Sequence, residues 1–234
     1  SITDIDDEET ISGNGDLNPT TSNNFDLLGE HFFKGIGIVS GGLFLKDMDE
    51  FIFLSTGVVS GGEYDGFDFE RPVNGAGARL FGYELTWQQQ FTKLAGVLSG
   101  FGIYANYTHT SSSDIDLGPD SSRTDIDLLP YQMESVSNFA LTYQKGGLTA
   151  RVAVNFSGKF IEEVGEDNDN DEWREEFTQW DVSGSYDFSK GFSLFLEFSN
   201  ISNRPRYNYI GIPSRAREHS VNGISFNTGL RWSL

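Results

Sequence analysis

The last fourteen residues, 221–234, read VNGISFNTGLRWSL, and this stretch decides the fold. Alternate positions carry apolar residues and one threonine: Ile224, Phe226, Thr228, Leu230, Trp232 and Leu234. Small, polar or charged residues stand between them. Successive side chains of a β-strand point to opposite faces, so the segment predicts a strand with one apolar and one polar face. The apolar face belongs either in the core of a soluble sandwich or against lipid outside a transmembrane barrel.

The same two-residue period recurs in earlier segments, and no segment has the period of a helix. The clearest is 148–160, where apolar residues alternate with Thr149, Arg151 and Asn155. The predicted strands are 23–33, 36–53, a strand running into 81–87, 101–108, 138–143, 148–160, 179–188, 192–203 and the terminal segment. The chain is therefore predicted to be all-β, with about nine strands.

Connection lengths alternate along the chain. Short links lie at 34–35, 94–99, 145–147 and 189–191, whereas long polar stretches occupy 1–21, 54–67, 111–131, 163–176 and 204–220. Outer-membrane barrels place short turns in the periplasm and long loops outside, and a Greek-key sandwich has no reason to keep this rhythm. The pattern favours an antiparallel up-and-down transmembrane β-barrel, whose apolar rows, including Val152, Trp180 and Phe226, face lipid. A soluble all-β ligand- or carbohydrate-binding module is the alternative.

Composition narrows the function classes. No window approaches 18 consecutive apolar residues, so a membrane-spanning helix is not predicted. The net charge of −19 argues against a nucleic-acid partner. The chain has no Cys, no nucleophile elbow and no phosphate-binding glycine loop, so we expect neither an enzyme nor a cofactor. Residue 1 opens no signal segment, and we interpret the chain as the back part of a longer one.

Several motifs resemble the β-barrel of TonB-dependent outer-membrane receptors. GNGDLNP at 13–19, followed by SNNFDL at 22–27, is similar to the family block "GNPDLKPE…S.N.DLG.EY". FSNISNRP at 198–205 resembles the family's "N.LTNRP". Further matches are Ala76, Arg79, Gly82, Glu84, Leu129 and Pro130. The family usually ends in Phe or Trp, whereas here Trp232 stands two residues before Leu234.

The resemblance implies a plugged 22-strand barrel in the cell outer membrane. Residues 1–234 would form its last nine or so strands, with the plug outside this chain. The implied function is import of a scarce nutrient, a siderophore-type chelate first and a glycan second, with TonB-derived energy. The implied partners are the remaining barrel and plug, the TonB complex, outer-membrane lipid and lipopolysaccharide, and the small-molecule cargo.

Strand number independently indicates an incomplete barrel. Bacterial single-chain barrels have even strand numbers, and nine is odd. Two open sheet edges in hydrocarbon would cost on the order of tens of kcal/mol, because each unpaired backbone group costs several. A small complete porin-like barrel remains the other alternative.

Three residue sets are candidate sites. The final loop offers guanidinium groups beside aromatic rings, which could hold an anionic ligand or instead pair with acidic loops or lipopolysaccharide phosphates: Arg204, Arg206, Tyr207, Tyr209, Arg215 and Arg217. Lumen-lining residues are predicted from strand parity: Arg151, Asn155, Asp181, Ser183, Asn227 and Arg231. Asp167, Asp169 and Asp171 resemble the start of a calcium loop, but Glu172 and Thr178 replace its Gly and Glu, which favours a solvated acidic loop.

Overall fold

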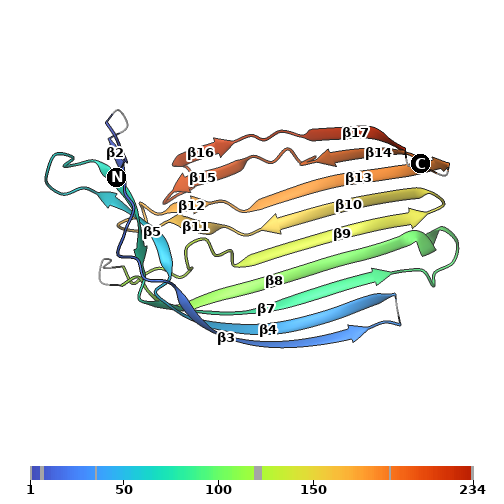
Figure 1. The fold of residues 1–234 in the computed structure, drawn as a ribbon, viewed down its shortest axis with the longest axis horizontal. Coiled ribbons are helices and arrows are strands. Elements are labelled where there is room, and N and C mark those ends of the chain that lie inside the picture. The colour runs from blue at the N-terminus through green and yellow to red at the C-terminus, as the bar shows by residue number, and fades with distance from the viewer. Residues whose placement is uncertain (1, 6–7, 35, 119–122, 190, 233–234) are drawn as a thin grey trace.

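The computed structural model describes residues 2–5, 8–34, 36–118, 123–189 and 191–232. Within these residues, nine strands form one antiparallel sheet in the order β17-β14-β13-β10-β9-β8-β7-β4-β3 (Figure 1). They are β3 (Thr21–Phe32), β4 (Gly37–Asp49), β7 (Gly77–Gln90), β8 (Phe101–Asp116), β9 (Ser135–Lys145), β10 (Leu148–Ser157), β13 (Phe177–Ser189), β14 (Phe192–Ser199) and β17 (Ser225–Trp232). Successive strands of this sheet pair with each other, which confirms the predicted all-β up-and-down arrangement.

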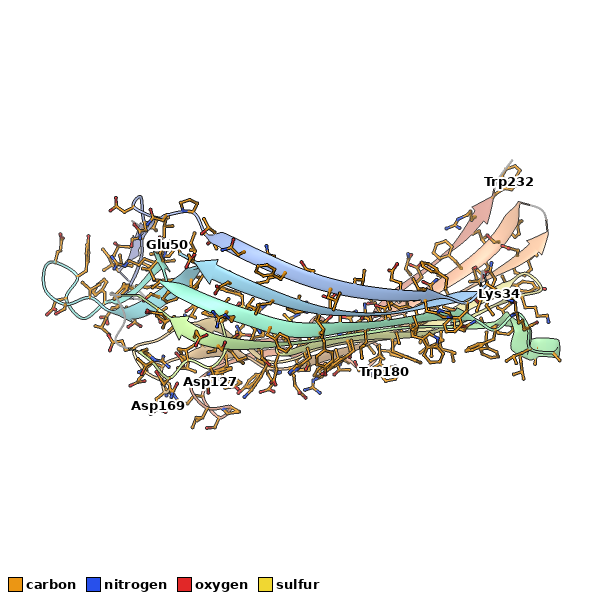
Figure 2. All side chains as sticks on the ribbon, turned by 90° about the horizontal axis from the view of Figure 1, so that it is seen from below. Lys34, Glu50, Asp127, Asp169, Trp180 and Trp232 are labelled. Carbon is orange, nitrogen blue, oxygen red and sulfur yellow. The ribbon has the colours of Figure 1, made fainter. Side chains whose placement is uncertain are left out.

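Strand register gathers the apolar residues on one face of this sheet. Val152 pairs with Val182, Val182 with Phe198, and Phe198 with Phe226, so one apolar row crosses four strands. The side chains of Trp180 and Phe226 are 42% and 55% exposed. The sheet is curved, and Trp180 lies on its convex side (Figure 2). These apolar rows therefore face outward from a barrel wall, and the soluble sandwich is excluded.

The ends of the strands depart from the predicted boundaries. Segment 36–53 is two strands, because the chain turns at Glu50, which has a φ of 55°, before β5 (Ile52–Val58). Segment 148–160 is also divided, between β10 and β11 (Phe160–Glu163). The link at 94–99 contains a 3₁₀ helix, η1 (Gly96–Gly100). Gly35 and Leu234, which the predicted first turn and terminal strand include, lie outside the described residues.

Eight short strands in the described part of the chain lie outside the main sheet and form two further sheets (Figure 1). Most of them lie in predicted long loops, but 68–74 follows the predicted loop 54–67, and 160–163 begins in the predicted strand 148–160. The N-terminal loop sheet has the order β1-β2-β6-β5 and adds β1 (Ile2–Asp4), β2 (Glu9–Ile11) and β6 (Asp68–Asn74). The C-terminal loop sheet has the order β11-β12-β15-β16 and adds β12 (Glu172–Arg174), β15 (Arg206–Ile210) and β16 (Ala216–Ser220). Both lie beyond the same end of the main sheet (Figure 1).

A buried apolar core lies at this long-loop end, and β5 and β11 meet there. The Val164 N–H donates to the Leu54 carbonyl at 3.3 Å, and the Thr56 N–H donates to the Val164 carbonyl at 3.1 Å. The core consists of Phe51, Phe53, Val73, Ala78, Leu117, Ile126, Leu129, Ile161 and Val164. It joins both loop sheets to the 111–131 segment. Among the described residues, no helix is long and apolar enough to cross a membrane.

Candidate ligand-binding site

The C-terminal loop sheet has two chemically different faces, and strand pairing identifies the inner one. Ser157 lies opposite Phe177, and Ser157 shares the parity of Arg151 and Asn155 on the polar face of the wall. The Arg206 guanidinium carbon lies 5.5 Å from the centroid of the Phe177 ring. Because side chains alternate along β15, Arg206 and Asn208 continue the polar, concave face of the barrel wall.

A hydrogen-bonded network fixes this inner face. Asn208 is 5% exposed, and its Nδ2 donates to Glu162 Oε2 at 2.6 Å and to Glu172 Oε1 at 2.9 Å. Arg174 donates from Nε to Asn208 Oδ1 at 3.3 Å and also forms an ion pair with Glu162. Arg217 Nε lies 3.6 Å from Glu172 Oε2. One buried amide thus contacts two carboxylates and one guanidinium group, and Arg217 joins the network through Glu172.

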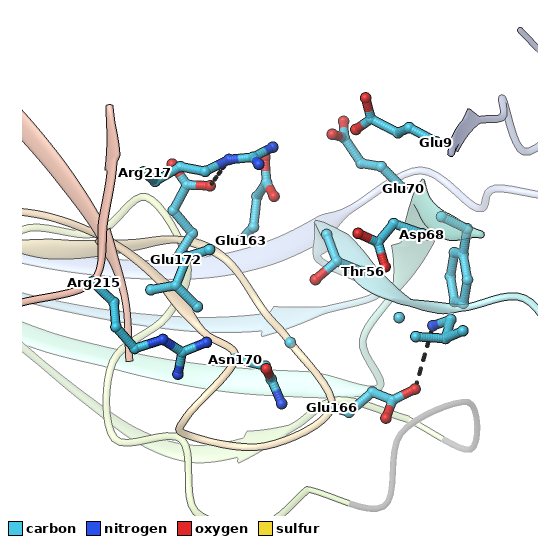
Figure 3. A pocket seen from close by; sticks show the side chains of 15 residues that line it. Glu9, Thr56, Asp68, Glu70, Glu163, Glu166, Asn170, Glu172, Arg215 and Arg217 are labelled. Atoms are coloured by element: carbon cyan, nitrogen blue, oxygen red, sulfur yellow. Dashed lines mark hydrogen bonds and ion pairs between the residues drawn. The ribbon is translucent and has the colours of Figure 1, made fainter. Parts of the chain in front are cut away.

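A cleft of about 330 Å³ separates the two loop sheets (Figure 3). Thr56 and the acidic residues Asp68 and Glu70 line its N-terminal side, and Glu172 and Arg217 line its C-terminal side (Figure 3). Its full set of charged lining residues is Glu9, Asp68, Glu70, Glu163, Glu166, Glu172, Arg215 and Arg217. Six acids against two arginines make the cleft acidic, with its positive charge confined to β16 and the turn before it.

Glu163 gives the cleft a charge that changes near neutral pH. Burial is the largest cause that raises the pKa of its carboxyl from 4.5 to about 7. The neighbouring carboxylates of Glu172, Glu70 and Glu162 raise the pKa further, and Arg217 opposes them. A carboxyl with this pKa is about half protonated at neutral pH.

A second hydrogen-bonded network joins the 111–131 and 163–176 segments. Arg123 donates to both oxygens of Asp171, from Nη1 at 2.5 Å and from Nη2 at 3.0 Å. It also donates to Asp125 Oδ1 at 3.0 Å and to the Gly165 carbonyl at 3.1 Å. Burial lowers the pKa of Arg123, but its hydrogen bonds to Asp171 and Asp125 outweigh burial and raise it. Asp171 is fully buried, and the positive charge of Arg123 compensates the negative charge of its carboxylate.

These contacts bear on the calcium hypothesis. Asp171 accepts hydrogen bonds from Arg123 and from the Gly165 N–H, and Asp167 accepts one from the Asp169 N–H at 3.0 Å. The described residues contain no group of three or more His, Asp or Glu side chains placed to hold a metal ion. Calcium binding at Asp167, Asp169 and Asp171 stays the less favoured alternative to a solvated acidic loop, although Asp171 itself is buried.

The structure divides the six residues predicted to contact ligand. Arg206 lies on the inner face, and Arg215 and Arg217 line the cleft. Tyr207 and Tyr209 have the opposite parity, and Tyr209, which is 4% exposed, pairs with Trp173, a residue packed against the apolar core. Arg204 lies apart, with Nη2 3.8 Å from Glu176 Oε1. Strand alternation through β15 separates the tyrosines from the arginines, which the prediction of an irregular loop did not foresee.

The six residues predicted to line the lumen share the polar parity of the wall. Arg151 pairs with Ser183, and Asn155 Nδ2 donates to Asp181 Oδ2 at 3.3 Å. Asn227 Nδ2 donates to Glu197 Oε2 at 3.1 Å, and the Arg231 guanidinium carbon lies 5.9 Å from the Phe195 ring centroid. Four of the six therefore form one patch on β10 and β13, and the other two follow on β17.

Sequence reasoning missed Asn208, Glu162, Arg174 and Arg123. Asn208 bonds to residues 36 and 46 positions away, and Arg123 to one 48 positions away. No local pattern marks such partners. The alternation of Arg206, Asn208 and Ile210 with Tyr207 and Tyr209 is the one signal that could have identified β15 as a strand.

A curved up-and-down sheet with its apolar face outward and long ordered loops at one end defines the wall of an outer-membrane β-barrel. The family model "TonB dependent receptor-like, beta-barrel" matches residues 5–201. The chain therefore belongs to this family, whose members sit in the outer membrane and are receptors, not enzymes.

Solved receptors share the fold. The ferric-catecholate import receptor Fiu of E. coli K12 has a TM-score of 0.63 and 16% identity over 94% of this chain and 28% of its own. The siderophore receptor PiuA of Acinetobacter baumannii has a TM-score of 0.61 and 16% identity, over 90% of this chain and 28% of its own. The copper transporter OprC has a TM-score of 0.63 and 15% identity, over 95% of this chain and 33% of its own. The chain thus spans a third or less of each. A search among curated proteins gave no match.

Proposed function

We propose that this chain forms the C-terminal part of the barrel and the ligand-facing loops of a TonB-dependent receptor. The receptor binds a scarce nutrient at the cell surface and imports it with TonB-derived energy. Strands outside residues 1–234 would complete the barrel by pairing with β3 and β17, the two edges of the sheet. The proposal is supported by the exposure of all twelve residues of β3 and by the chain's small share of its structural neighbours.

The plug domain, which would also lie outside this chain, would fill the completed barrel. Arg151, Asn155, Asp181, Ser183, Asn227 and Arg231 would line the lumen against it. The TonB complex would act through the plug, and outer-membrane lipid and lipopolysaccharide would surround the wall. The six lumen-lining residues share one parity on the concave face of the sheet, which supports this role for them.

The observation that carries the cargo assignment is the cleft at the mouth of the barrel, with ordered arginines beside it. Arg206, Arg215 and Arg217 offer forked donors that match carboxylate or catecholate oxygens. A siderophore-type chelate is therefore the favoured cargo. A glycan is the second candidate, because the six carboxylates of the cleft accept hydrogen bonds from sugar hydroxyls and repel an anionic chelate.

Binding of a ferric catecholate and of a neutral oligosaccharide to the purified receptor, followed by fluorescence quenching, tests the assignment. The Arg215→Gln/Arg217→Gln variant, which changes the two arginines that line the cleft, should weaken chelate binding at least about tenfold, because each charge-assisted hydrogen bond contributes about 1.5–3 kcal/mol. Arg204→Gln is the matched control, because Arg204 pairs with Glu176 and does not line the cleft. Equal loss in the control contradicts the site, and binding of the oligosaccharide alone selects the second candidate. Uptake of radiolabelled iron that persists in cells lacking TonB contradicts energised import.

A further inference from the structure

The four short turns share a charge pattern that the transport function does not use. Residues 33–36, 91–100, 144–147 and 189–191 each contain one lysine and no acid, in a chain with 35 acidic residues. These lysines are Lys34, Lys93, Lys145 and Lys190, and the other two lysines of the chain, Lys46 and Lys159, lie elsewhere. Lys190 lies outside the described residues, and the other three lie within them.

The turns form one rim of the sheet, opposite the loop sheets (Figure 1), and Figure 2 labels Lys34 at this end. The side chains of Lys34, Lys93 and Lys145 are exposed. The nearest acids on β3 and β13, Glu30 and Asp187, have the parity of the concave polar face. The lysines of the rim therefore carry positive charge that no acid in their turns offsets.

The 91–100 turn adds an exposed apolar surface. Leu94, Val97 and Leu98 are 48%, 67% and 51% exposed. Lys145 Nζ donates to Ser99 Oγ at 2.7 Å and to the Gly96 carbonyl, which fixes η1 against the next turn.

The position of η1 places this apolar surface on the lipid side of the wall. A Cβ on Gly100 would lie 2.8 Å from Cε2 of Tyr143, so the backbone of η1 rests on that ring. Tyr143 has the parity of Leu141, which pairs with Val152 in the outward rows. The exposed apolar residues of the turn thus continue the lipid-facing surface of the wall.

Aromatic contacts mark the depth of the rim in the membrane. The ring centroids of His31 and Phe33 are 4.7 Å apart, those of Phe101 and Tyr143 4.9 Å, and those of Phe188 and Phe192 5.9 Å. Aromatic belts of this kind lie at the headgroup level of a bilayer. The lysines lie at or just beyond this belt, where long cationic side chains reach lipid phosphates.

We propose that this rim binds anionic glycerophospholipid of the adjoining membrane leaflet. The lysine side chains contact the phosphates, and residues 94–98 insert between the acyl chains. Charge favours this partner, because a chain of net charge −19 is otherwise repelled by an anionic leaflet. Continuity of the turn with the lipid-facing rows favours lipid over a periplasmic protein. The inference needs only the outer-membrane location of the family and holds whatever the cargo is.

The first test measures lipid selectivity of the receptor in phosphatidylcholine vesicles at low ionic strength. Nitroxide-labelled phosphatidylglycerol and phosphatidylcholine report how strongly each associates with the protein. The Lys34→Gln/Lys93→Gln/Lys145→Gln variant should lose a preference for the anionic lipid of about fivefold per lysine contact. Lys46→Gln/Lys159→Gln is the matched control and should retain it. No preference in the wild type, an unchanged preference in the triple variant, or an equal loss in the control overturns the proposal.

The second test locates the turn directly, by single labelling of a receptor in which any cysteine outside residues 1–234 is replaced, since these residues contain none. A nitroxide at Val97→Cys should be accessible to oxygen and protected from a water-soluble nickel chelate, whereas one at Glu63→Cys serves as the aqueous reference. Access of the nickel chelate to residue 97 overturns insertion. Protection of residue 97 from both quenchers identifies a protein contact and also overturns the proposal. Heat-modifiable migration on gels confirms that each variant is folded.

Discussion

The barrel wall and the loop sheets are built from the same alternating strands but are stabilised in opposite ways. The wall leaves one apolar row after another exposed, with Phe226 55% exposed and Phe81 53%. In the loop sheets, Phe53 and Val73 are only 3% and 2% exposed, and the Arg123–Asp171 pair is enclosed. Lipid completes the wall, so it needs no second layer, whereas the loops stand in water and must bury their own core. Four predictions test this difference, from the largest expected effect to the smallest.

Arg123→Met should destabilise the loop assembly by about 3–5 kcal/mol, because it leaves the Asp171 carboxylate buried and uncompensated. Hydrogen exchange should show lost protection at 111–118 and 163–176, with the wall strands unchanged. Arg79→Met is the control, because its ion pairs with Asp47 and Asp114 are exposed and contribute less than about 1 kcal/mol. Equal loss of protection in the wall would show that the two regions unfold together.

Phe53→Ala should cost about 3–5 kcal/mol in the loop core, because it removes a buried ring and leaves a cavity. Phe226→Ala on the wall should cost less, about 1.5–3 kcal/mol, because lipid closes around the smaller side chain and only the transfer term is lost. Hydrogen-exchange protection of the loop segments measures the effect of Phe53→Ala. Urea unfolding of the reconstituted receptor measures the effect of Phe226→Ala. A reversed order contradicts the assignment of the two environments.

Val152→Arg should destabilise the wall by about 2–4 kcal/mol, because it places a charge on the lipid-facing row. Ser183→Arg lies on the concave face and should be nearly neutral by comparison. Folding yields into bilayers at graded urea concentrations distinguish the two variants. A larger cost at Ser183 than at Val152 would show that the apolar rows do not face lipid.

The smallest expected effect is a dependence of the stability of the loop assembly on pH. Glu163 is partly exposed, so solvent screening limits the contribution of its carboxyl to this stability to below about 1 kcal/mol. Its pKa in the folded protein, about 7, exceeds its ordinary value of 4.5, so the folded assembly prefers the protonated form. The stabilisation is complete below pH 4.5 and is lost as pH rises through about 7.

Hydrogen exchange near the Ser55–Val164 bridge should therefore be slower at pH 5.5 than at pH 8.5, after correction for intrinsic exchange rates. Glu163→Gln should remove the difference and remain protected at pH 8.5. Glu218→Gln, at an exposed acid of the same loop sheet, should behave as the wild type. A pH dependence that survives in Glu163→Gln assigns the effect to another group.

Prediction from the sequence succeeded where strands were long. In β10, alternation over ten residues, interrupted only at Ala153, identified both faces, and register extended the face of Val152 across the sheet. It failed in the loops, where strands of three to seven residues carry too little alternation to recognise. Phe51 and Phe53 looked like the end of one long strand, because their periodicity alone cannot show that the chain turns at Glu50.

The candidate site shows the same division between local pattern and distant partner. Arg206, Arg215 and Arg217 could be proposed from composition, but their separation from Tyr207 and Tyr209 required the pairing of β15 with β12. The sequence alone determined the all-β class, the two-faced strands and the end that carries the long loops, because side-chain alternation and turn chemistry are local properties. Only the tertiary structure decided which loop residues meet, because Asn208, Glu162, Arg123 and Asp171 acquire their roles through partners dozens of residues away.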